Sequence, residues 1–209
     1  MKILRLLLVV LFILATFTTS TQGESTSEDG DEYVRDACSV TRYQDICIHS
    51  LESYSNSAKR SSRKWAQAAV AVAMGEAKNV THYLYKLKQN GSIRRRRQRT
   101  ALSDCIECFE ETIDNIGNSL GELRRLNAKR FDAQMGNVET WMSSALTYED
   151  TCMDGFEGSN RKGKQVKLLR NKIWKMSCIT SNALALVSKL ASAGERSLTN
   201  NSTIDELQV

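Results

Sequence analysis

The sequence contains no proline among its 209 residues. Proline breaks helix interiors and marks turns, so its absence permits long helices almost everywhere along the chain. Runs that alternate β-branched and polar residues, a pattern typical of half-buried strands, are also hard to find. Together the two absences favour an all-helical protein.

Groups that carry catalysis are scarce as well. The two histidines, His49 and His82, lie in no motif with a nucleophile and at no metal-ligand spacing. The chain has no glycine-rich phosphate loop, no His-Glu-x-x-His and no Gly-x-Ser-x-Gly. Paired acids such as Glu110 and Glu111 are ordinary on solvated helix faces. We therefore expect a binding protein that is not an enzyme and that needs no metal and no cofactor.

Only the first residues form a long apolar run. Lys2 and Arg5 precede an apolar stretch over residues 6–17, and small or polar residues follow to Gly23. This is the layout of a secretory signal peptide, and the stretch is shorter than the about 20 residues that span a membrane. We expect residues 1–23 to be removed, by cleavage after Ser20 or Gly23, and the mature chain to be secreted without a membrane anchor.

Export would also allow N-glycosylation. Four asparagines lie in Asn-x-Ser/Thr sequons, namely Asn79, Asn90, Asn200 and Asn201. Asn90 is the best placed of the four because it lies in an expected loop, whereas Asn79 lies within a helical pattern.

The positive charge is modest but unevenly spread. The net charge of +5 falls to +3 without residues 1–23, because these hold two of the 29 basic residues and none of the 24 acidic ones. The densest cluster consists of Arg94, Arg95, Arg96, Arg97 and Arg99. We interpret it as a solvated basic linker before a helix, with contact to an acidic partner, to a polyanion such as pectin, or to a processing protease as alternatives. The cluster has no interleaved aromatics and the chain is exported, so no nucleic acid is expected.

Four segments repeat apolar residues at the three- and four-residue spacing of amphipathic helices. The first runs from 62 to 89, and the apolar stripes of the others cover 102–123, 138–156 and 166–190. Short polar links with glycine separate these segments. The simplest way to bury four stripes is an antiparallel up-down four-helix bundle over residues 62–192.

A shorter helical hairpin is expected before the bundle, over residues 33–57, where Thr41 would cap a helix that starts at Arg42. Thr100 or Ser103 would cap the second bundle helix. Residues 24–32 and 193–209 are polar and are expected to form an N-terminal segment and a tail outside the domain.

Six cysteines allow 15 disulfide pairings. Cys38 and Cys47 are nine residues apart in the expected hairpin, so a turn between two short helices would bring them together. Cys105 and Cys152 fall on the apolar stripes of the second and third bundle helices, and antiparallel neighbours can present them face to face. The remaining two, Cys108 and Cys178, would be free thiols or form one extra bridge.

Cys105 and Cys108 also form a Cys-x-x-Cys motif, which admits two sharper interpretations. A redox dithiol needs a βαβ context and an exposed helix N-terminus, and the sequence offers neither. A zinc site made with Cys152 and Cys178 lacks the second short-spaced cysteine pair of structural zinc sites. Both interpretations are disfavoured.

Five short motifs occur in order at compatible spacing: Cys38-Ser-Val-Thr41-Arg-Tyr43-Gln-Asp-Ile-Cys47, Ala101-Leu102-Ser-Asp104-Cys105, Thr140-Trp141-Met-Ser143-Ser-Ala145-Leu146-Thr147, Thr151-Cys152-Met-Asp154-Gly155-Phe156 and Ser181-Asn182-Ala183-Leu184-Ala185-Leu186. This pattern resembles the plant invertase and pectin methylesterase inhibitor family and covers residues 33–190. The resemblance implies an extracellular bundle behind a hairpin, with the pairs Cys38–Cys47 and Cys105–Cys152. It also implies inhibition by a reversible complex that covers the active-site cleft of the target enzyme.

Two target enzymes are open under this resemblance. Invertase inhibitors of the family carry a Pro-Lys-Phe tripeptide, and this chain has no proline. We therefore expect an inhibitor of pectin methylesterase in the apoplast and cell wall, with acid invertase as the alternative target. A basic pectin-binding module and a pro-region of a pectin methylesterase precursor are further alternatives. Cys108 and the arginine cluster depart from the family pattern.

Overall fold

The computed structural model describes residues 25–93, 95–157 and 163–196. The expected signal peptide (1–23), Arg94, Asn200 and Asn201 lie outside the described residues. All regular elements of the described part are helices, in agreement with the all-helical expectation.

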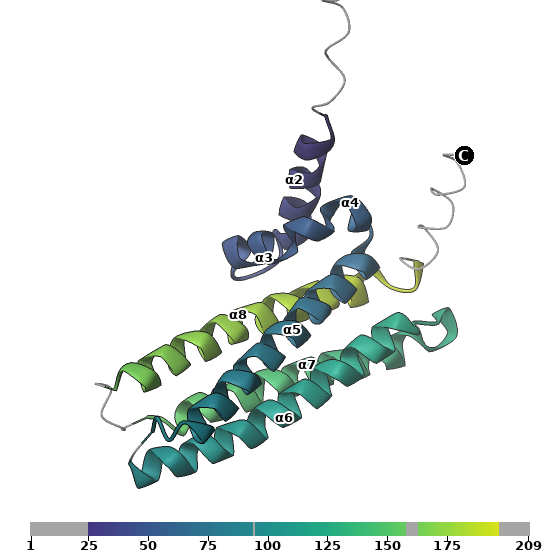
Figure 1. Ribbon diagram of the computed structural model, residues 1–209. Helices are drawn as coiled ribbons and strands as arrows, with labels where there is room; N and C mark the ends of the chain where they lie inside the picture. The colour runs from purple at the N-terminus through teal and green to yellow at the C-terminus, as the bar shows by residue number, and fades with distance from the viewer. Residues whose placement is uncertain (1–24, 94, 158–162, 197–209) are drawn as a thin grey trace, which may run out of the picture.

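A helical hairpin precedes the long helices (Figure 1). It consists of α2 (Ser25–Cys38) and α3 (Gln44–Leu51), and the short helices η1 (Glu52–Tyr54) and α4 (Ser55–Ala58) lead from it to the rest of the chain. Several of its apolar side chains are buried and belong to the same core as those of the long helices, including Val34, Ala37 and Leu51.

Four long helices then form a bundle (Figure 1). They are α5 (Ser62–Gln89), α6 (Arg96–Arg124), α7 (Phe131–Asp154) and α8 (Lys164–Ala193), with the short helix η2 (Ala128–Arg130) between α6 and α7. Each packs against the next, and α8 closes the bundle by packing against α5. α5 is therefore diagonal to α7, and α6 is diagonal to α8.

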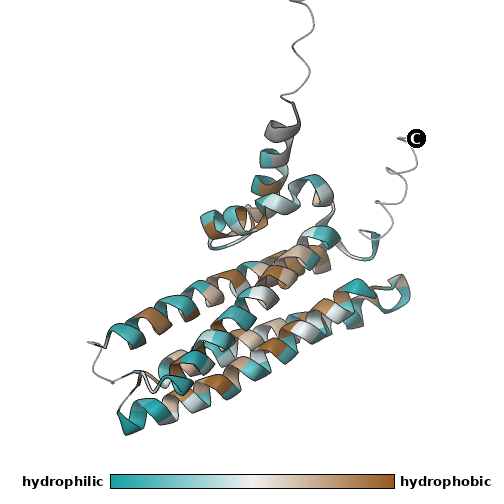
Figure 2. Ribbon diagram, viewed as in Figure 1, coloured by the Kyte–Doolittle hydropathy of each residue, from teal (hydrophilic) through white to brown (hydrophobic). Residues whose placement is uncertain are grey.

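Side chains of contrasting size fill the centre of the bundle. α5 contributes small residues such as Ala66, Ala73 and Ala77, and α6 contributes Phe109 and Ile116, all of which are fully buried. Small residues let neighbouring helices approach closely, and the large rings and branched chains fill the space between them. Figure 2 shows the resulting alternation of hydrophilic and hydrophobic segments along each bundle helix. No helix of the described part is long and apolar enough to cross a membrane.

Several helix ends have the residues that local chemistry favours. The side chain of Ser61 caps α5 by accepting a hydrogen bond from the backbone N–H of Lys64 at 3.3 Å. Gly91, directly after α5 and its C-cap, has a φ of 56°, and Gly194 at the end of α8 has a φ of 69°. Both angles are left-handed, a region that glycine adopts without steric cost.

Two predicted caps are wrong. The Thr41 hydroxyl donates to the carbonyl of Cys38 at 2.7 Å, and α3 begins later, at Gln44, without a side-chain cap. The hydroxyl is used to close the turn that follows α2, so it is not free to cap the next helix.

The second bundle helix also begins earlier than expected. α6 starts at Arg96, so Thr100 and Ser103 lie inside the helix and cap nothing. Arginine is a good helix former, and a charged segment without an apolar stripe gives no periodicity signal. α2 likewise begins in a polar segment without an apolar stripe, at Ser25, within the residues expected to lie outside the domain.

Candidate functional site

Two disulfides join helices of the fold, one within the hairpin and one within the bundle. Cys38 of α2 is bonded to Cys47 of α3 with a Cα–Cα distance of 5.8 Å, which closes the hairpin. Cys105 of α6 is bonded to Cys152 of α7 with a Cα–Cα distance of 4.4 Å. These are the two pairs that the sequence indicates. The Cys105–Cys152 bridge fixes α7 against α6 and so presents the outer face of α7 on a rigid support.

The other two cysteines are free thiols. Burial raises the pKa of the Cys178 thiol and that of the half-buried Cys108 thiol, and nearby carboxylates, Asp104 foremost, raise the pKa of Cys108 further. A raised pKa keeps a thiol protonated and unreactive. The described residues contain no group of three or more His, Cys, Asp and Glu side chains placed to hold a metal ion.

Two of the four sequons lie on the described surface. Asn79 is exposed on α5, where its side-chain amide donates to the Glu76 carboxylate at 3.4 Å. Asn90 is the exposed C-cap residue of the same helix. Both positions leave the asparagine side chain accessible to solvent, as glycosylation requires.

The four described arginines of the cluster do not form a linker, so this expectation is wrong for them. Arg95 is the N-cap of α6, and Arg96, Arg97 and Arg99 lie in its first turns, all exposed to solvent. Cations at a helix N-terminus face the positive end of the helix dipole, so this placement does not stabilise the helix. The cluster lies at the end of the bundle where α8 also begins (Figure 1).

One carboxyl group of the described residues is fully buried inside the bundle. Glu149 of α7 is fully buried, and burial raises its pKa to about 7, against the lowering effect of a hydrogen bond from Thr180 and of the nearby Ser177 hydroxyl of α8. One of its carboxylate oxygens has no hydrogen-bond partner. His49 and His82 are both exposed, on α3 and α5. The charge of Glu149 helps to raise the pKa of the buried Cys178 thiol, which therefore stays protonated, and we assign the buried carboxyl group a structural role.

The outer face of α7 differs in character from the rest of the surface. α7 contains no lysine or arginine, although the chain has 29 basic residues. Its solvent side carries a stripe of small side chains at three- and four-residue spacing, which we call the hydroxyl face and which consists of Gly136, Thr140, Ser143, Ser144, Thr147 and Thr151. All but the half-buried Ser144 are exposed.

The hydroxyls of this face are bonded within their own helix. Thr140 donates to the carbonyl of Gly136 at 2.8 Å, Thr147 to Ser143 at 3.0 Å, and Thr151 to Thr147 at 2.8 Å. These donors therefore lose no partner when another surface covers them, and short side chains lose little conformational entropy. A face of short side chains on a helix without lysine or arginine suits docking against another protein.

The signal for this face was present in the sequence. Thr140, Ser144, Thr147 and Thr151 recur at three- and four-residue spacing within the third helical segment. Hydroxyl residues on a helix surface are common, however, and only the packing of α7 against α6 and α8 shows which side of the helix remains open. Sequence reasoning named no interface residue.

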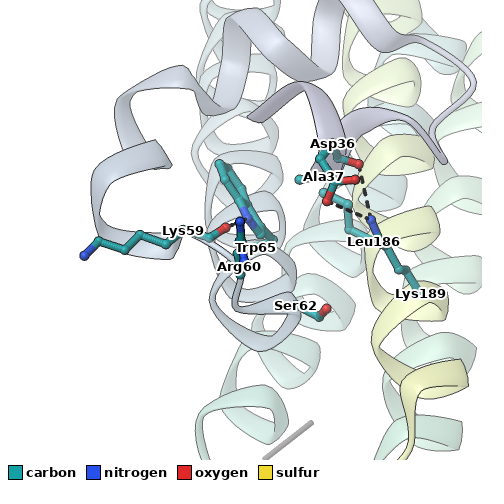
Figure 3. Close-up of a pocket in the computed structure, with 8 residues that line it drawn as sticks. All are labelled: Asp36, Ala37, Lys59, Arg60, Ser62, Trp65, Leu186 and Lys189. Carbon is teal, nitrogen blue, oxygen red and sulfur yellow. Dashed lines mark hydrogen bonds and ion pairs between the residues drawn. The ribbon is translucent and has the colours of Figure 1, made fainter. Parts of the chain in front are cut away.

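A small cavity lies where the hairpin meets the bundle (Figure 3). Lys189 of α8 contacts Asp36 of α2 across it, with 3.2 Å to the carbonyl and 3.8 Å to the carboxylate. The Trp65 indole N–H donates to the Lys59 carbonyl at 2.7 Å, and Lys59 has a left-handed φ of 45°. The cavity of about 50 Å³ has room for a few water molecules and lies at the contact between the hairpin and the bundle.

Comparison with known proteins relates the sequence to one family. Residues 32–186 match the family model described as plant invertase/pectin methylesterase inhibitor. Pectinesterase inhibitor 6 of Arabidopsis thaliana is 44% identical over 162 residues, which are 78% of this chain and 77% of that protein. Pectinesterase inhibitor 9 of the same plant is 32% identical over 196 residues, 91% of this chain and 96% of that protein.

A solved structure shares the fold. The crystal structure of a mutant form of a pectin methylesterase inhibitor from Arabidopsis superposes with a TM-score of 0.59 at 17% sequence identity. The match covers 72% of this chain and 92% of that one.

Proposed function

Because this chain belongs to the plant invertase/pectin methylesterase inhibitor family, we propose that it inhibits a pectin methylesterase by forming a reversible complex with the enzyme. The observation that carries the proposal is its similarity, over more than three quarters of both chains, to a protein named pectinesterase inhibitor. The family is one of inhibitors, so the chain is a binding protein and not an enzyme.

The mechanism we propose is steric. The hydroxyl face of α7 docks over the active-site cleft of the enzyme, and inhibition follows because the polysaccharide substrate can no longer enter. The Cys105–Cys152 bridge holds α7 rigidly, which reduces the entropy lost on binding. In this mechanism no side chain of the inhibitor takes part in bond making or breaking.

The sequons support the choice of this face. Asn79 and Asn90 belong to α5, which is diagonal to α7 in the bundle, so glycans there would point away from the hydroxyl face. A glycan attached beside a docking surface would obstruct the partner. The placement thus leaves the α7 side free and the α5 side covered.

We propose pectin methylesterase as the target in preference to acid invertase, since the chain has no proline and therefore no Pro-Lys-Phe tripeptide. We also propose that the protein acts outside the cell, in the cell wall. The layout of residues 1–23, with a basic start and a short apolar stretch, supports secretion.

The docking face is tested with the variant Thr147→Arg. A long cation in the middle of the hydroxyl face should clash with the docked enzyme and introduce a charge that must be desolvated. We expect complex formation with a plant pectin methylesterase, measured by gel filtration or calorimetry, to weaken by about tenfold or more.

Thr100→Arg is the matched control. Thr100 is exposed, and its hydroxyl also bonds a carbonyl four residues back, that of Arg96, but on α6. The control variant should bind like the unmodified protein. Equal binding by the Thr147→Arg variant would show that the enzyme docks elsewhere.

A further inference from the structure

Helix α8 carries no acidic residue along its 30 residues, and it contains six basic ones. A long helix whose charged residues are all basic creates a local positive field. α7, packed against it, has the opposite bias, with acidic residues and no basic ones. The two neighbouring helices thus present surfaces of contrasting chemistry.

The cations of α8 fall into two groups. Three have partners: Lys172 lies over the ring of Tyr83 at 5.2 Å, Lys175 pairs with Glu76 at 3.7 Å, and Lys189 contacts Asp36. Lys164, Lys167 and Arg170 make no ion pair within the described part of the chain. Lys164 and Lys167 lie in the first turn, where the helix dipole disfavours cations. The three side chains therefore gain nothing from an ion pair, and two of them are placed against the helix dipole.

An exposed tryptophan continues the same stripe. Trp174 follows Lys167 by seven residues and Arg170 by four, so the three side chains lie on one face of α8. The Trp174 side chain is 53% exposed, the largest value among the big apolar residues of the described part. From Lys164 to Trp174 the stripe is about 15 Å long.

The tryptophan is held in place by the hairpin. The rings of Tyr43 and Trp174 meet edge to face, with 6.4 Å between centroids, and the Arg42 guanidinium lies 5.5 Å from the Tyr43 ring. Asn182 clamps the backbone of Tyr43 through hydrogen bonds of 3.1 and 2.9 Å to its N–H and carbonyl. The stripe thus ends at the Tyr43–Trp174 ring pair, with the Arg42 guanidinium beside it. Asp45 of α3 is an exposed acid in the same hairpin.

We infer that this stripe of α8, bounded by Lys164 and Trp174 and continued by Arg42, binds a polyuronate, a polysaccharide whose sugars carry carboxylates. Sugar rings expose C–H groups on their flat faces, which pack on the negative face of an indole. The unpaired cations meet the carboxylates of neighbouring sugars along the chain. A single anion would need no aromatic surface, and an apolar partner would need no cations, so the combination fits a charged carbohydrate.

The inference is independent of the proposed inhibition. α8 lies beside α7, so an enzyme on the hydroxyl face and a polysaccharide on α8 would occupy neighbouring sides of the bundle (Figure 1). Binding to a wall polymer would then concentrate the protein near enzymes that act on the same polymer.

The test measures binding of the full secreted protein to de-esterified polygalacturonate fragments, by calorimetry and by tryptophan fluorescence. Trp65 is buried and Trp141 is half-buried, so a fluorescence change on binding should come from Trp174. Fully methyl-esterified fragments of the same length, which carry no charge, should bind at least about tenfold more weakly. We expect the double variant K167S/R170S to weaken binding to polygalacturonate by about tenfold, and Trp174→Ala to abolish the fluorescence change.

The matched control is K129S/R130S. It removes the same charge from exposed residues of η2, at the other end of the bundle (Figure 1), and should leave affinity within about twofold. If the control weakened binding equally, net charge alone would explain the effect, and the proposed site would be contradicted. Equal affinity for esterified and de-esterified fragments would also contradict the proposed site. Loss of enzyme inhibition by K167S/R170S with unchanged polygalacturonate binding would assign the stripe to a protein partner instead.

Discussion

The carboxylate of Glu149 accepts a hydrogen bond of 2.7 Å from the Thr180 hydroxyl, which joins α7 to α8 inside the bundle. The side chain is fully buried, and desolvation raises its pKa to about 7 from the ordinary 4.5. The groups that face it are Thr180 and Ser177 of α8, and Asp150 on its own helix raises the pKa further. No cation is among these groups, so the charged form gains no compensating ion pair.

This pKa makes stability depend on pH. Well below pH 4.5 the carboxyl group of Glu149 is protonated in both the folded and the unfolded chain, so it does not lower the free energy of unfolding through its charge. Between pH 4.5 and about 7 the folded state holds a proton that the unfolded state releases, so stability falls as pH rises. We expect Glu149 to contribute a loss of about 3 kcal/mol over this range.

The variant Glu149→Gln isolates that contribution, because the amide stays neutral and its oxygen can still accept from Thr180. Urea unfolding of both proteins at several pH values between 4 and 8 measures the difference. The variant should gain stability relative to the unmodified protein as pH rises. A difference that does not change with pH would show that Glu149 is not protonated in the folded state.

The two disulfides should differ in their effect on stability. The Cys105–Cys152 bridge closes a loop with a sequence separation of 47 residues, and the Cys38–Cys47 bridge one of nine. Loop entropy predicts a loss of about 4 kcal/mol for C105S/C152S and about 3 kcal/mol for C38S/C47S. Denaturant unfolding of each double variant checks the order. A larger loss in the hairpin variant would mean that the bundle does not depend on its bridge.

Thiol reactivity should separate the remaining cysteines. Cys178 is 1% exposed and Cys108 is half-buried, and both pKa values are raised, chiefly by burial. A thiol reagent at pH 8 should therefore modify Cys108 slowly and Cys178 only after unfolding, with two thiols per chain in denaturant. Rapid modification of both thiols in the folded protein would contradict this account of their surroundings.

The sequence revealed the bundle helices wherever an apolar stripe ran to the helix end. Helix α5 has the expected bounds, 62 to 89, because its stripe begins at Trp65 and glycine follows at Gly91. The start of α6 was missed because Arg96, Arg97 and Arg99 carry no periodic signal, and the helix extends through them as exposed residues. Propensity and neighbouring packing decide such ends, and neither appears in a hydrophobic pattern.

Less of the candidate site than of the fold could be predicted from the sequence. Cysteines are rare and their spacing is informative, so Cys38–Cys47 followed from its short separation in the expected hairpin and Cys105–Cys152 from the apolar stripes on which both residues lie. A docking face of threonine and serine resembles any solvated helix surface, and only the packed bundle shows that Thr140 and Thr147 remain exposed on a helix without cations. The stripe of α8 was hidden for a related reason, since Trp174 lies within an apolar repeat and its exposure is a property of the fold.

The most direct test of the inhibitor assignment is a titration of the purified protein into a plant pectin methylesterase and, separately, into an acid invertase. Methanol release reports the first enzyme and glucose release the second. We predict that methanol release falls to a low plateau as the protein approaches equimolar amounts, while glucose release is unchanged. Loss of glucose release alone would reassign the target to invertase, and no loss of either activity at micromolar protein would contradict inhibition altogether.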